Sequence, residues 1–463
     1  MKATALTSSL LLLCSTLLTA CNGQIAIPLQ GTVPPRSQSS VSVQHEAIET
    51  IEDEVIVKYR SGFSTQASRP LPAGIQVLDA FQNADENTQL QRLPKNLKMD
   101  QALQNYAADP SVEFAVPNMR FKVQMNLLDK SKNLLKPVSK SSGQTLSTRA
   151  VLPERVSTLS ESIQAQDPLS GDQWYLADMS MNQVWTEHGT GSSGVTVAVL
   201  DTGVDYTHPD LDGRIIKGPD YIDQDFDPKD EHGHGTHVAG IIAAGLNNSQ
   251  GITGIAPQVR VMAIRVLNAK GSGSLFHIAK GIAYAANNGA KVINLSLGSS
   301  SAGSIMKTLA NYLASYADRK GALIIAAAGN AGGAIGFPAA ASKFLAVGAV
   351  NEQKYLASFS NRGPEVDLVA PGVNIMSTFP TYDVTANESG LPHDYASLNG
   401  TSMATPIVSA LAALVLSQDP YLTPGQLRER LESTATDLGS IGRDNLFGAG
   451  LINPIKALEK STD

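Results

Sequence analysis

Cysteine is almost absent from this sequence. Of 463 residues only Cys14 and Cys21 are cysteine, and both lie close to the N-terminus. The chain after residue 21 therefore cannot form a disulfide framework. If the chain is exported, bound ions are the obvious remaining way to cross-link and stabilise its fold.

Basic residues are also too few to form a broad phosphate-binding face. Lys and Arg number 35 against 42 Asp and Glu, which gives a formal net charge of −7 and a pI near 5.7. This balance argues against nucleic acid as a partner. Hydrophobic residues make up 42% of the chain, enough to bury at least one large core, and the length suggests about three domains.

The first 21 residues, "MKATALTSSLLLLCSTLLTAC", combine one early lysine, an apolar stretch and small residues before a cysteine. This pattern predicts a signal peptide over residues 1–20, because the apolar part is too short for a membrane span. "LTAC" is similar to the bacterial lipobox, which implies that Cys21 is acylated and anchors an exported precursor at the cell envelope. An ordinary signal peptide with an incidental Cys21 is the alternative.

Composition divides the rest of the chain. Residues 21–50 are rich in Gln, Ser, Pro and Thr and predict a flexible tether. Residues 51–125 contain the strand pattern "EVIVKYR", a helical pattern from 97 and a second strand pattern, which together predict a small α+β domain. Residues 126–165 are Lys/Ser/Thr/Gln-rich and predict a linker that is exposed to proteolysis.

From residue 166 to 463, short apolar runs alternate with helical patterns, and the runs end at residues 201, 267, 298, 330 and 350. Strands this apolar are covered by helices on both faces, so we predict an α/β fold with a doubly wound, mostly parallel sheet. Ligands bind beyond the carboxyl ends of such strands. The first candidates for a site are therefore the polar residues that close these runs, Asp201, Ser296 and Asn330.

Three separated segments supply the groups that a serine hydrolase needs: "VLDTGVD" with Asp201, "HGHGTHVAG" with His234 and "NGTSMATP" with Ser402. They resemble the Asp, His and Ser motifs of the subtilisin-like serine proteases, thermitase-like and fervidolysin-like members included, in that family's chain order. The likeness covers residues 167–455 and implies a serine endopeptidase. A serine hydroxyl needs a base such as His234, and Asp201 would fix the tautomer of that base. In the family, the asparagine at Asn330 donates its amide to the oxyanion.

The histidines at 232, 234 and 237 have two interpretations. Their spacing differs from the zinc-binding H-E-x-x-H pattern, and no further carboxylate lies in register. The continuation G-T-H-V-A-G matches the family motif with His234 as the base, so we expect His237 to be a packed helix residue. "MATPIVSALAALVLS" after Ser402 predicts a buried helix with Pro406 in its first turn, and the N-terminus of that helix would favour an oxyanion.

The resemblance also implies how a polypeptide substrate binds. "GSGS" at 271–274 and "SLGS" at 296–299 are similar to the two segments between which the family clamps a peptide as an added strand. No acidic residue is evident at the expected specificity pocket, which favours neutral, apolar side chains before the cleaved bond. The implied binding residues are Gly271, Ser272, Gly273, Ser296, Leu297, Gly298 and Gly329.

Two loops are similar to calcium sites of the family. "LNNSQGI" at 246–252 implies a structural Ca²⁺ held by hard oxygen ligands. The implied ligands are Asp167, Asp210, Leu246, Asn248, Gln250 and Ile252. The acidic loop "DYIDQDFD" is similar to a second site with Asp220, Asp223, Asp225 and Asp227, but Lys229 stands where a ligand is expected. A solvated acidic loop is the alternative there.

The small α+β domain resembles the inhibitory propeptide of these enzymes, with a permanent accessory domain as the alternative. The sequence therefore predicts a self-inhibited, monomeric proenzyme that cuts its own linker and releases the mature catalytic domain outside the cell. Its substrates would be polypeptides, cleaved through an acyl-enzyme. Two other functions stay open: a catalytically idle, peptide-binding member of the fold, and a serine esterase.

Overall fold

The computed structural model describes residues 49–60, 74–83, 86–123, 162–298 and 304–459. The predicted signal peptide, Cys21, nearly all of the tether and most of the linker lie outside these residues. By their contacts, residues 45–463 group into one compact unit. The small domain and the large domain described below both belong to that unit.

The small domain is an antiparallel sheet with one helix, as the sequence predicts. Its strands lie in the order β2 (Gln76–Asn83), β3 (Glu86–Arg92), β1 (Thr50–Tyr59) and β4 (Val112–Lys122), and α1 is Met99–Ala107. Alternation along β1 places Val55 and Val57 in a core with Tyr106 of α1, whereas Ile56 belongs to a core shared with the large domain. The small domain thus packs one face of its sheet on its own helix and the other on the large domain.

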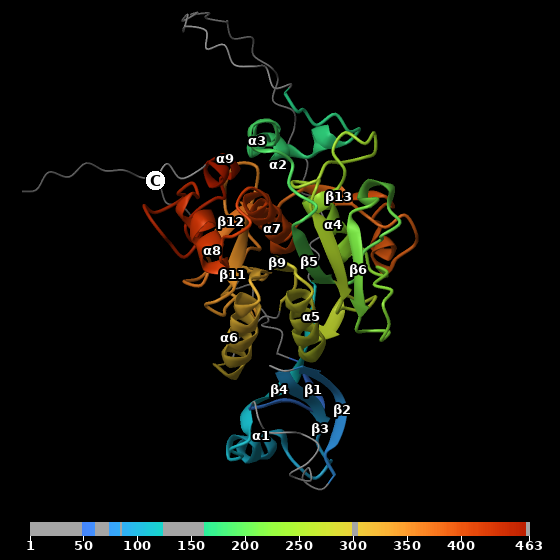
Figure 1. The fold of residues 1–463 in the computed structure, drawn as a ribbon, viewed down its shortest axis with the longest axis vertical. Helices are drawn as coiled ribbons and strands as arrows, with labels where there is room; N and C mark the ends of the chain where they lie inside the picture. The colour runs from blue at the N-terminus through green and yellow to red at the C-terminus, as the bar shows by residue number, and fades with distance from the viewer. Residues whose placement is uncertain (1–48, 61–73, 84–85, 124–161, 299–303, 460–463) are drawn as a thin grey trace, which may run out of the picture. The chain divides into compact units, whose positions relative to one another are not determined.

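The large domain is built on a parallel sheet in the order β12-β11-β10-β9-β5-β7-β6 within the described residues (Figure 1). From β9 the strands follow chain order outward to β12, while on the other side of β5 lie β7 and then β6. The chain thus winds away from the β5–β9 pair on both sides, which confirms the predicted doubly wound α/β fold. The strands are β5 (Thr196–Asp201), β6 (Ile215–Asp220), β7 (Arg260–Arg265), β9 (Val292–Leu295), β10 (Leu323–Ala327), β11 (Leu345–Val350) and β12 (Leu368–Pro371).

Helices cover both faces of this sheet. Along β5, Val197 and Val199 face a core with α4 (His234–Ala243) and α7 (Thr401–Gln418), while Ala198 and Leu200 face a core with α5 (Leu275–Asn287) and α6 (Ser304–Arg319). This double burial explains why the strands are apolar throughout.

Shorter elements complete the large domain. They are the helices α2 (Trp174–Asp178), α3 (Met181–His188), α8 (Pro424–Ser433) and α9 (Pro454–Leu458), the 3-10 turns η1 (Ser170–Asp172), η2 (Pro209–Leu211) and η3 (Thr385–Ser389), the strand β8 (Ser272–Ser274) and the hairpin β13 (Ile375–Thr378) and β14 (Tyr395–Leu398). In the described part of the chain, only α7 is long and apolar enough to cross a membrane. Because 89% of that window is buried inside the fold, it is weak evidence for a span.

One detail of α7 differs from the prediction. The helix begins at Thr401, so Pro406 lies beyond the first turn, inside the helix. A proline there removes the N–H that would bond the carbonyl of Ser402, four residues earlier. In the structure, the hydroxyl of Ser296 donates to that carbonyl instead.

Candidate active site

A buried carboxylate and imidazole meet where strand β5 ends and helix α4 begins. Asp201 is the last residue of β5 and His234 the first of α4. The Nδ1 atom of His234 lies 2.8 Å from Oδ1 of Asp201, and both side chains are fully buried. Within the described residues, Nε2 of His234 has no hydrogen-bond partner. This arrangement orients the imidazole and leaves one nitrogen to act as a base.

The glycines of the two motifs permit this close approach. A Cβ at Gly235 would lie 2.0 Å from the carbonyl oxygen of Gly203 and 3.1 Å from Cβ of Asp201. Gly203 itself has a φ of +103°, and a Cβ there would lie 2.6 Å from the carbonyl oxygen of Lys229. Glycine is needed at Gly235 because the backbone of α4 packs directly against the segment after β5, and at Gly203 because of its positive φ and the nearby backbone of Pro228 and Lys229.

Ser402 is the second residue of α7 and is tied to Ser296 by two hydrogen bonds. Its hydroxyl donates to the carbonyl of Ser296 at 3.0 Å, and the Ser296 hydroxyl donates to the carbonyl of Ser402 at 2.9 Å. The second bond satisfies the carbonyl that Pro406 leaves without a helical donor. Asn294 of β9 donates to the Ser296 hydroxyl at 2.9 Å and accepts from the Ser409 hydroxyl at 2.9 Å. A buried series of hydrogen bonds therefore links β9 to α7 at Ser402 and again at Ser409.

Asn330 lies beside the start of α7. Its Oδ1 accepts from the backbone N–H and the hydroxyl of Thr401, each at 2.9 Å. These two bonds hold the Asn330 side chain against the first residue of α7. Asn330 and Ser402 line one pocket, so the structure brings the two predicted residues together.

That pocket has no acidic lining among the described residues. It is lined by Lys122, Leu297, Gly298, Ala327, Ala328, Gly329, Asn330, Ala331, Gly336, Phe337, Asn361, Thr401 and Ser402. Gly329 has a φ of +104°, and a Cβ there would lie 2.4 Å from Nδ2 of Asn361. The predicted binding residues Leu297, Gly298 and Gly329 therefore belong to this wall.

The last strand of the small domain runs through the predicted peptide clamp. Arg120, Phe121 and Lys122 of β4 pair antiparallel with Ser274, Gly273 and Ser272 of β8, and Lys122 also bridges to Gly298. The N–H of Val123 donates to the carbonyl of Gly271 at 2.9 Å. The chain segment that fills the clamp was missed by sequence reasoning, although the strand pattern "VEFAVPNMRFKV" just before the linker is a usable signal.

The two other histidines of the motif are neutral residues with different surroundings. His237 is fully buried, and its Nε2 lies 3.0 Å and 3.1 Å from the carbonyl oxygens of Ala396 and Ile375. Burial lowers the pKa of His237 to about 3 and that of His232 to about 4. The described residues include no group of three or more His, Cys, Asp or Glu arranged to hold a metal ion.

The loop at 246–252 wraps around two buried carboxylates. Asp210 accepts from the side chain of Asn248 at 2.8 Å and from the N–H of Ile252 at 2.9 Å. Asp167 accepts from the N–H of Asn247, at 2.7 Å. Burial raises the pKa of Asp210, and no ion pair to either carboxylate occurs among the described residues. Within the described residues, both carboxylates thus accept hydrogen bonds from N–H groups of the loop and have no cationic side-chain partner. Carboxylate oxygens are the ligand type that a hard cation takes.

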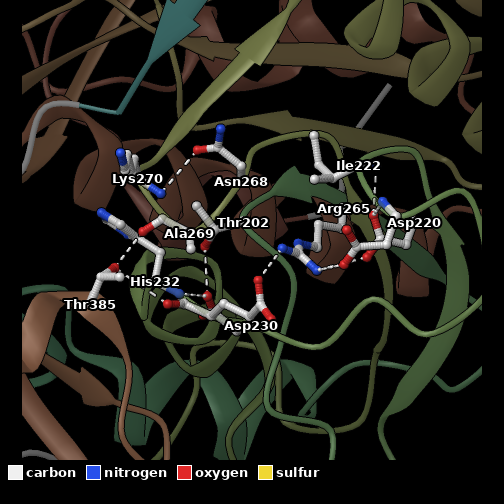
Figure 2. A network of polar contacts seen from close by, with 12 residues as sticks. Thr202, Asp220, Ile222, Asp230, His232, Arg265, Asn268, Ala269, Lys270 and Thr385 are labelled. Carbon is white, nitrogen blue, oxygen red and sulfur yellow. Dashed lines mark hydrogen bonds and ion pairs between the residues drawn. The ribbon is translucent and has the colours of Figure 1, made fainter.

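The acidic loop around Asp220 does not fit a second cation. The guanidinium of Arg265 lies 2.8 Å from Asp220 and 2.9 Å from Asp223, and Figure 2 shows it between carboxylates. Lys217 pairs with Asp227 at 2.8 Å. A side chain that is already positive therefore sits where the ion would be needed.

A doubly wound α/β domain with a buried Asp–His pair, a serine at a helix start and a strand paired with the predicted peptide-binding segments points to the serine-hydrolase class. Comparison with known proteins makes this specific. The subtilase family model matches residues 192–450, and a fervidolysin N-terminal prodomain model matches residues 36–118. The chain belongs to the subtilase family and carries such a prodomain.

Three relatives illustrate the likeness. A "Thermophilic serine proteinase" of Bacillus sp. (strain AK1) is 49% identical over 269 residues, which cover 58% of this chain and 62% of that protein. "Subtilisin Savinase" of Lederbergia lenta is 47% identical over 266 residues, covering 57% of this chain and 91% of that protein. "Thermitase" of Thermoactinomyces vulgaris is 43% identical over 268 residues, covering 58% and 89%. The matched part thus spans less than two thirds of the first relative.

Proposed function

We propose that this protein is a serine endopeptidase that cleaves peptide bonds through an acyl-enzyme. The observation that carries the proposal is the buried Asp201–His234 pair, at 2.8 Å, with Nε2 of His234 unpartnered among the described residues. Ser402 supplies the nucleophile from the start of α7.

In the reaction, the hydroxyl of Ser402 leaves the carbonyl of Ser296 and gives its proton to Nε2 of His234 as its oxygen attacks the scissile carbonyl. Asp201 stabilises the imidazolium that forms. His234 then returns the proton to the leaving amine, and water releases the acyl group by the same route. The amide of Asn330 and the N-terminus of α7 stabilise the oxyanion; loss of one such donor lowers turnover by about two to three orders of magnitude, a value measured on a subtilisin.

Substrates are polypeptides bound in an extended form. The pairing of β4 with β8 and Gly298 supports this mode, because main-chain hydrogen bonds read any sequence. The pocket beside Ser402 is lined by small and apolar residues such as Ala327, Ala328 and Phe337. The enzyme therefore prefers an apolar substrate side chain just before the cleaved bond and tolerates many side chains at the other substrate positions.

The prodomain inhibits the enzyme before processing. Strand β4 takes the place of a substrate strand, and further contacts hold the two domains together. Asp79 pairs with Lys280 at 2.7 Å, the rings of Phe81 and Phe276 lie 5.6 Å apart, and Asn118 accepts from the N–H of Phe276 at 3.2 Å. Cleavage in the linker at 126–165 would let the prodomain leave.

One structural calcium ion is held by the loop at 246–252. The ligands are Asp167, Asp210, Leu246, Asn248, Gln250 and Ile252. Because the mature chain would contain no disulfide, an ion bound only by the folded state stabilises it by mass action. The second acidic loop is left out of this proposal, since Arg265 already neutralises it.

The precursor is exported and acylated at Cys21, and the mature catalytic domain works outside the cell as a monomer. This part of the proposal is supported by the "MKATALTSSLLLLCSTLLTAC" pattern, which lies outside the described residues.

Casein digestion by the purified chain, with and without a fluorophosphonate, tests the proposed activity. We expect digestion that the fluorophosphonate abolishes, and Ser402→Ala should accumulate as an unprocessed chain. Cleavage of ester but not of casein would indicate an esterase. Inertness toward both, after the prodomain has been removed, would indicate a peptide-binding protein without catalysis.

A further inference from the structure

We propose that Thr202 and Asp230 form a clamp that positions the Asp201–His234 pair, with the Thr202 hydroxyl as its link. The proposal rests on the proposed proteolytic function and concerns two residues that touch neither substrate nor the reacting atoms. Both are fully buried. They are positioning residues, because they act through the backbone on either side of the catalytic pair.

Thr202 contacts Asp201 and the residue that follows His234. Its backbone N–H donates to Oδ1 of Asp201 at 2.8 Å, the same oxygen that faces Nδ1 of His234. Its hydroxyl accepts from the N–H of Gly235, the residue after His234, at 2.9 Å. The end of β5 and the first turn of α4 are therefore joined through one side chain.

Asp230 completes the link. The hydroxyl of Thr202 donates to Oδ1 of Asp230 at 2.9 Å, and Figure 2 shows this contact beside the one to the backbone of His232. The same oxygen accepts from the N–H groups of His232 and Gly233, at 2.9 and 2.8 Å. Oδ2 accepts from the N–H and hydroxyl of Thr236, at 2.9 and 2.7 Å.

These five donors surround a carboxylate that has no Lys or Arg partner in the described part of the chain. They include three N–H groups on either side of His234, so the carboxylate caps the first turn of α4. Burial raises the pKa of Asp230, and the N–H groups of Gly233, Thr236 and His232 oppose that shift. The Asp230 carboxylate therefore holds the first turn of α4 against β5, because the hydrogen bonds that it accepts among the described residues come from the residues around that turn and from Thr202.

The clamp has a functional consequence. A small displacement of a catalytic group can lower a rate by about 100-fold, and a base whose carboxylate partner has moved also loses stabilisation of its protonated form. The titratable groups around the pair include Asp201 on β5, Asp230 and His232 in the loop before α4, His237 on α4, and Tyr382 and Asp205 from the segments packed against Asp230 and Thr236.

The test compares Thr202→Val, which keeps the shape but removes the hydroxyl, with Thr202→Ser, which keeps the hydroxyl. Thr196→Val is the control, because Thr196 is a buried threonine at the opposite end of the same strand. Each processed enzyme is titrated with a fluorophosphonate, so that kcat is counted per active site and loss of folded protein does not enter. The kcat, KM and pH dependence of kcat/KM are measured on a peptide substrate.

We expect kcat of Thr202→Val to fall about 10- to 100-fold with KM nearly unchanged. The acid limb of its kcat/KM profile should move to lower pH, because a less well held carboxylate favours the imidazolium less. Thr202→Ser should restore both values, and Thr196→Val should match the parent. If Thr202→Val does not mature, Asp230→Asn serves instead, with the same direction of change.

Two results would overturn the clamp. One is a Thr202→Val enzyme whose kcat per titrated site and acid limb equal those of the parent. The other is a Thr202→Ser enzyme as impaired as Thr202→Val, which would assign the loss to the missing methyl group. A parent chain without any protease activity would contradict the proposed function itself, which is a separate outcome.

Discussion

The Ser296 hydroxyl donates to the backbone carbonyl of Ser402, at 2.9 Å, in the place that Pro406 leaves without a helical donor. The proline therefore does not simply weaken α7. It frees the carbonyl of Ser402, the proposed nucleophile, for a bond from Ser296, the residue that follows strand β9, so that the start of the helix is fixed to the end of that strand.

Ser296→Ala tests this connection. The carbonyl of Ser402 would lose its donor and the amide of Asn294 its acceptor, and a buried unsatisfied polar group costs about 1–3 kcal/mol. We expect a lower thermal midpoint and a kcat reduced about tenfold or more, with a smaller change in KM, because the backbone carbonyl of Ser296 stays available to substrate. Ser409→Ala changes the other end of this series of hydrogen bonds, farther from Ser402, and should lower stability with less effect on kcat. An unchanged kcat in Ser296→Ala would refute the connection.

Gly235→Ala tests the close approach of α4 to β5. The new methyl group would lie 2.0 Å from the carbonyl oxygen of Gly203, so the helix must move away from Asp201. We expect loss of nearly all activity and a destabilisation of about 1–3 kcal/mol or more. Gly425→Ala is the matched control, since Gly425 is the second residue of α8 and a Cβ there meets nothing within 4 Å. Chemical unfolding should find this control neutral or stabilised by up to about 1 kcal/mol.

Acid stability should depend on His237. Its pKa is lowered by burial to about 3, from an ordinary value of 6.5. Between these values the unfolded chain binds a proton that the folded chain does not, so the stability contributed above pH 6.5 is lost as the pH falls toward 3. His237→Gln should flatten the pH dependence of the unfolding free energy in this window, by up to about 1.4 kcal/mol per pH unit. The exposed His393, as His393→Gln, should leave the slope unchanged; equal slopes in all three proteins would exclude His237 as the cause.

Calcium removal should weaken the mature enzyme. Chelator is expected to lower the thermal midpoint and speed autolysis, since an ion at a hundredfold excess over its dissociation constant contributes about 2.7 kcal/mol. Asp210→Ala should reproduce most of this loss, and the difference between the two proteins should fade once both are calcium-free. Asp225→Ala, in the acidic loop that Arg265 and Lys217 neutralise, is the control and should keep the parent's response to chelator. A midpoint indifferent to both chelator and Asp210→Ala would remove the calcium assignment.

The five predicted strands of the large domain correspond to β5, β7, β9, β10 and β11, because continuous apolar runs are a strong signal for strands buried on both faces. The outer strands β6 and β12 were not predicted. "IIKGPD" and "LVAP" are short and contain glycine or proline, so their strand state depends on the neighbouring strand and not on local pattern.

Part of the candidate site could likewise be predicted from local sequence, and part could not. Asp201, Ser296 and Asn330 follow from strand ends, and His234 and Ser402 from motifs. The pairing of β4 with β8 joins segments about 150 residues apart, and no local pattern encodes such a register. Asp230 was overlooked, because it lies three residues before Gly233, the N-cap of α4, and so outside the position at which a capping side chain is expected. The role of Thr202 could not be predicted from the sequence, because only the structure shows which groups its buried hydroxyl contacts.

The most direct test of the account is the site of covalent labelling by a fluorophosphonate, located by mass spectrometry in the processed enzyme. We predict one adduct, on Ser402, in the parent and in His232→Ala, and none in His234→Ala, because His234 is the histidine of this motif whose ring is hydrogen-bonded to Asp201 in the described part of the chain. His232→Ala should also keep most of the peptidase activity. A labelled residue other than Ser402, or equal labelling of Ser402 in His234→Ala and His232→Ala, would contradict the proposed catalytic site.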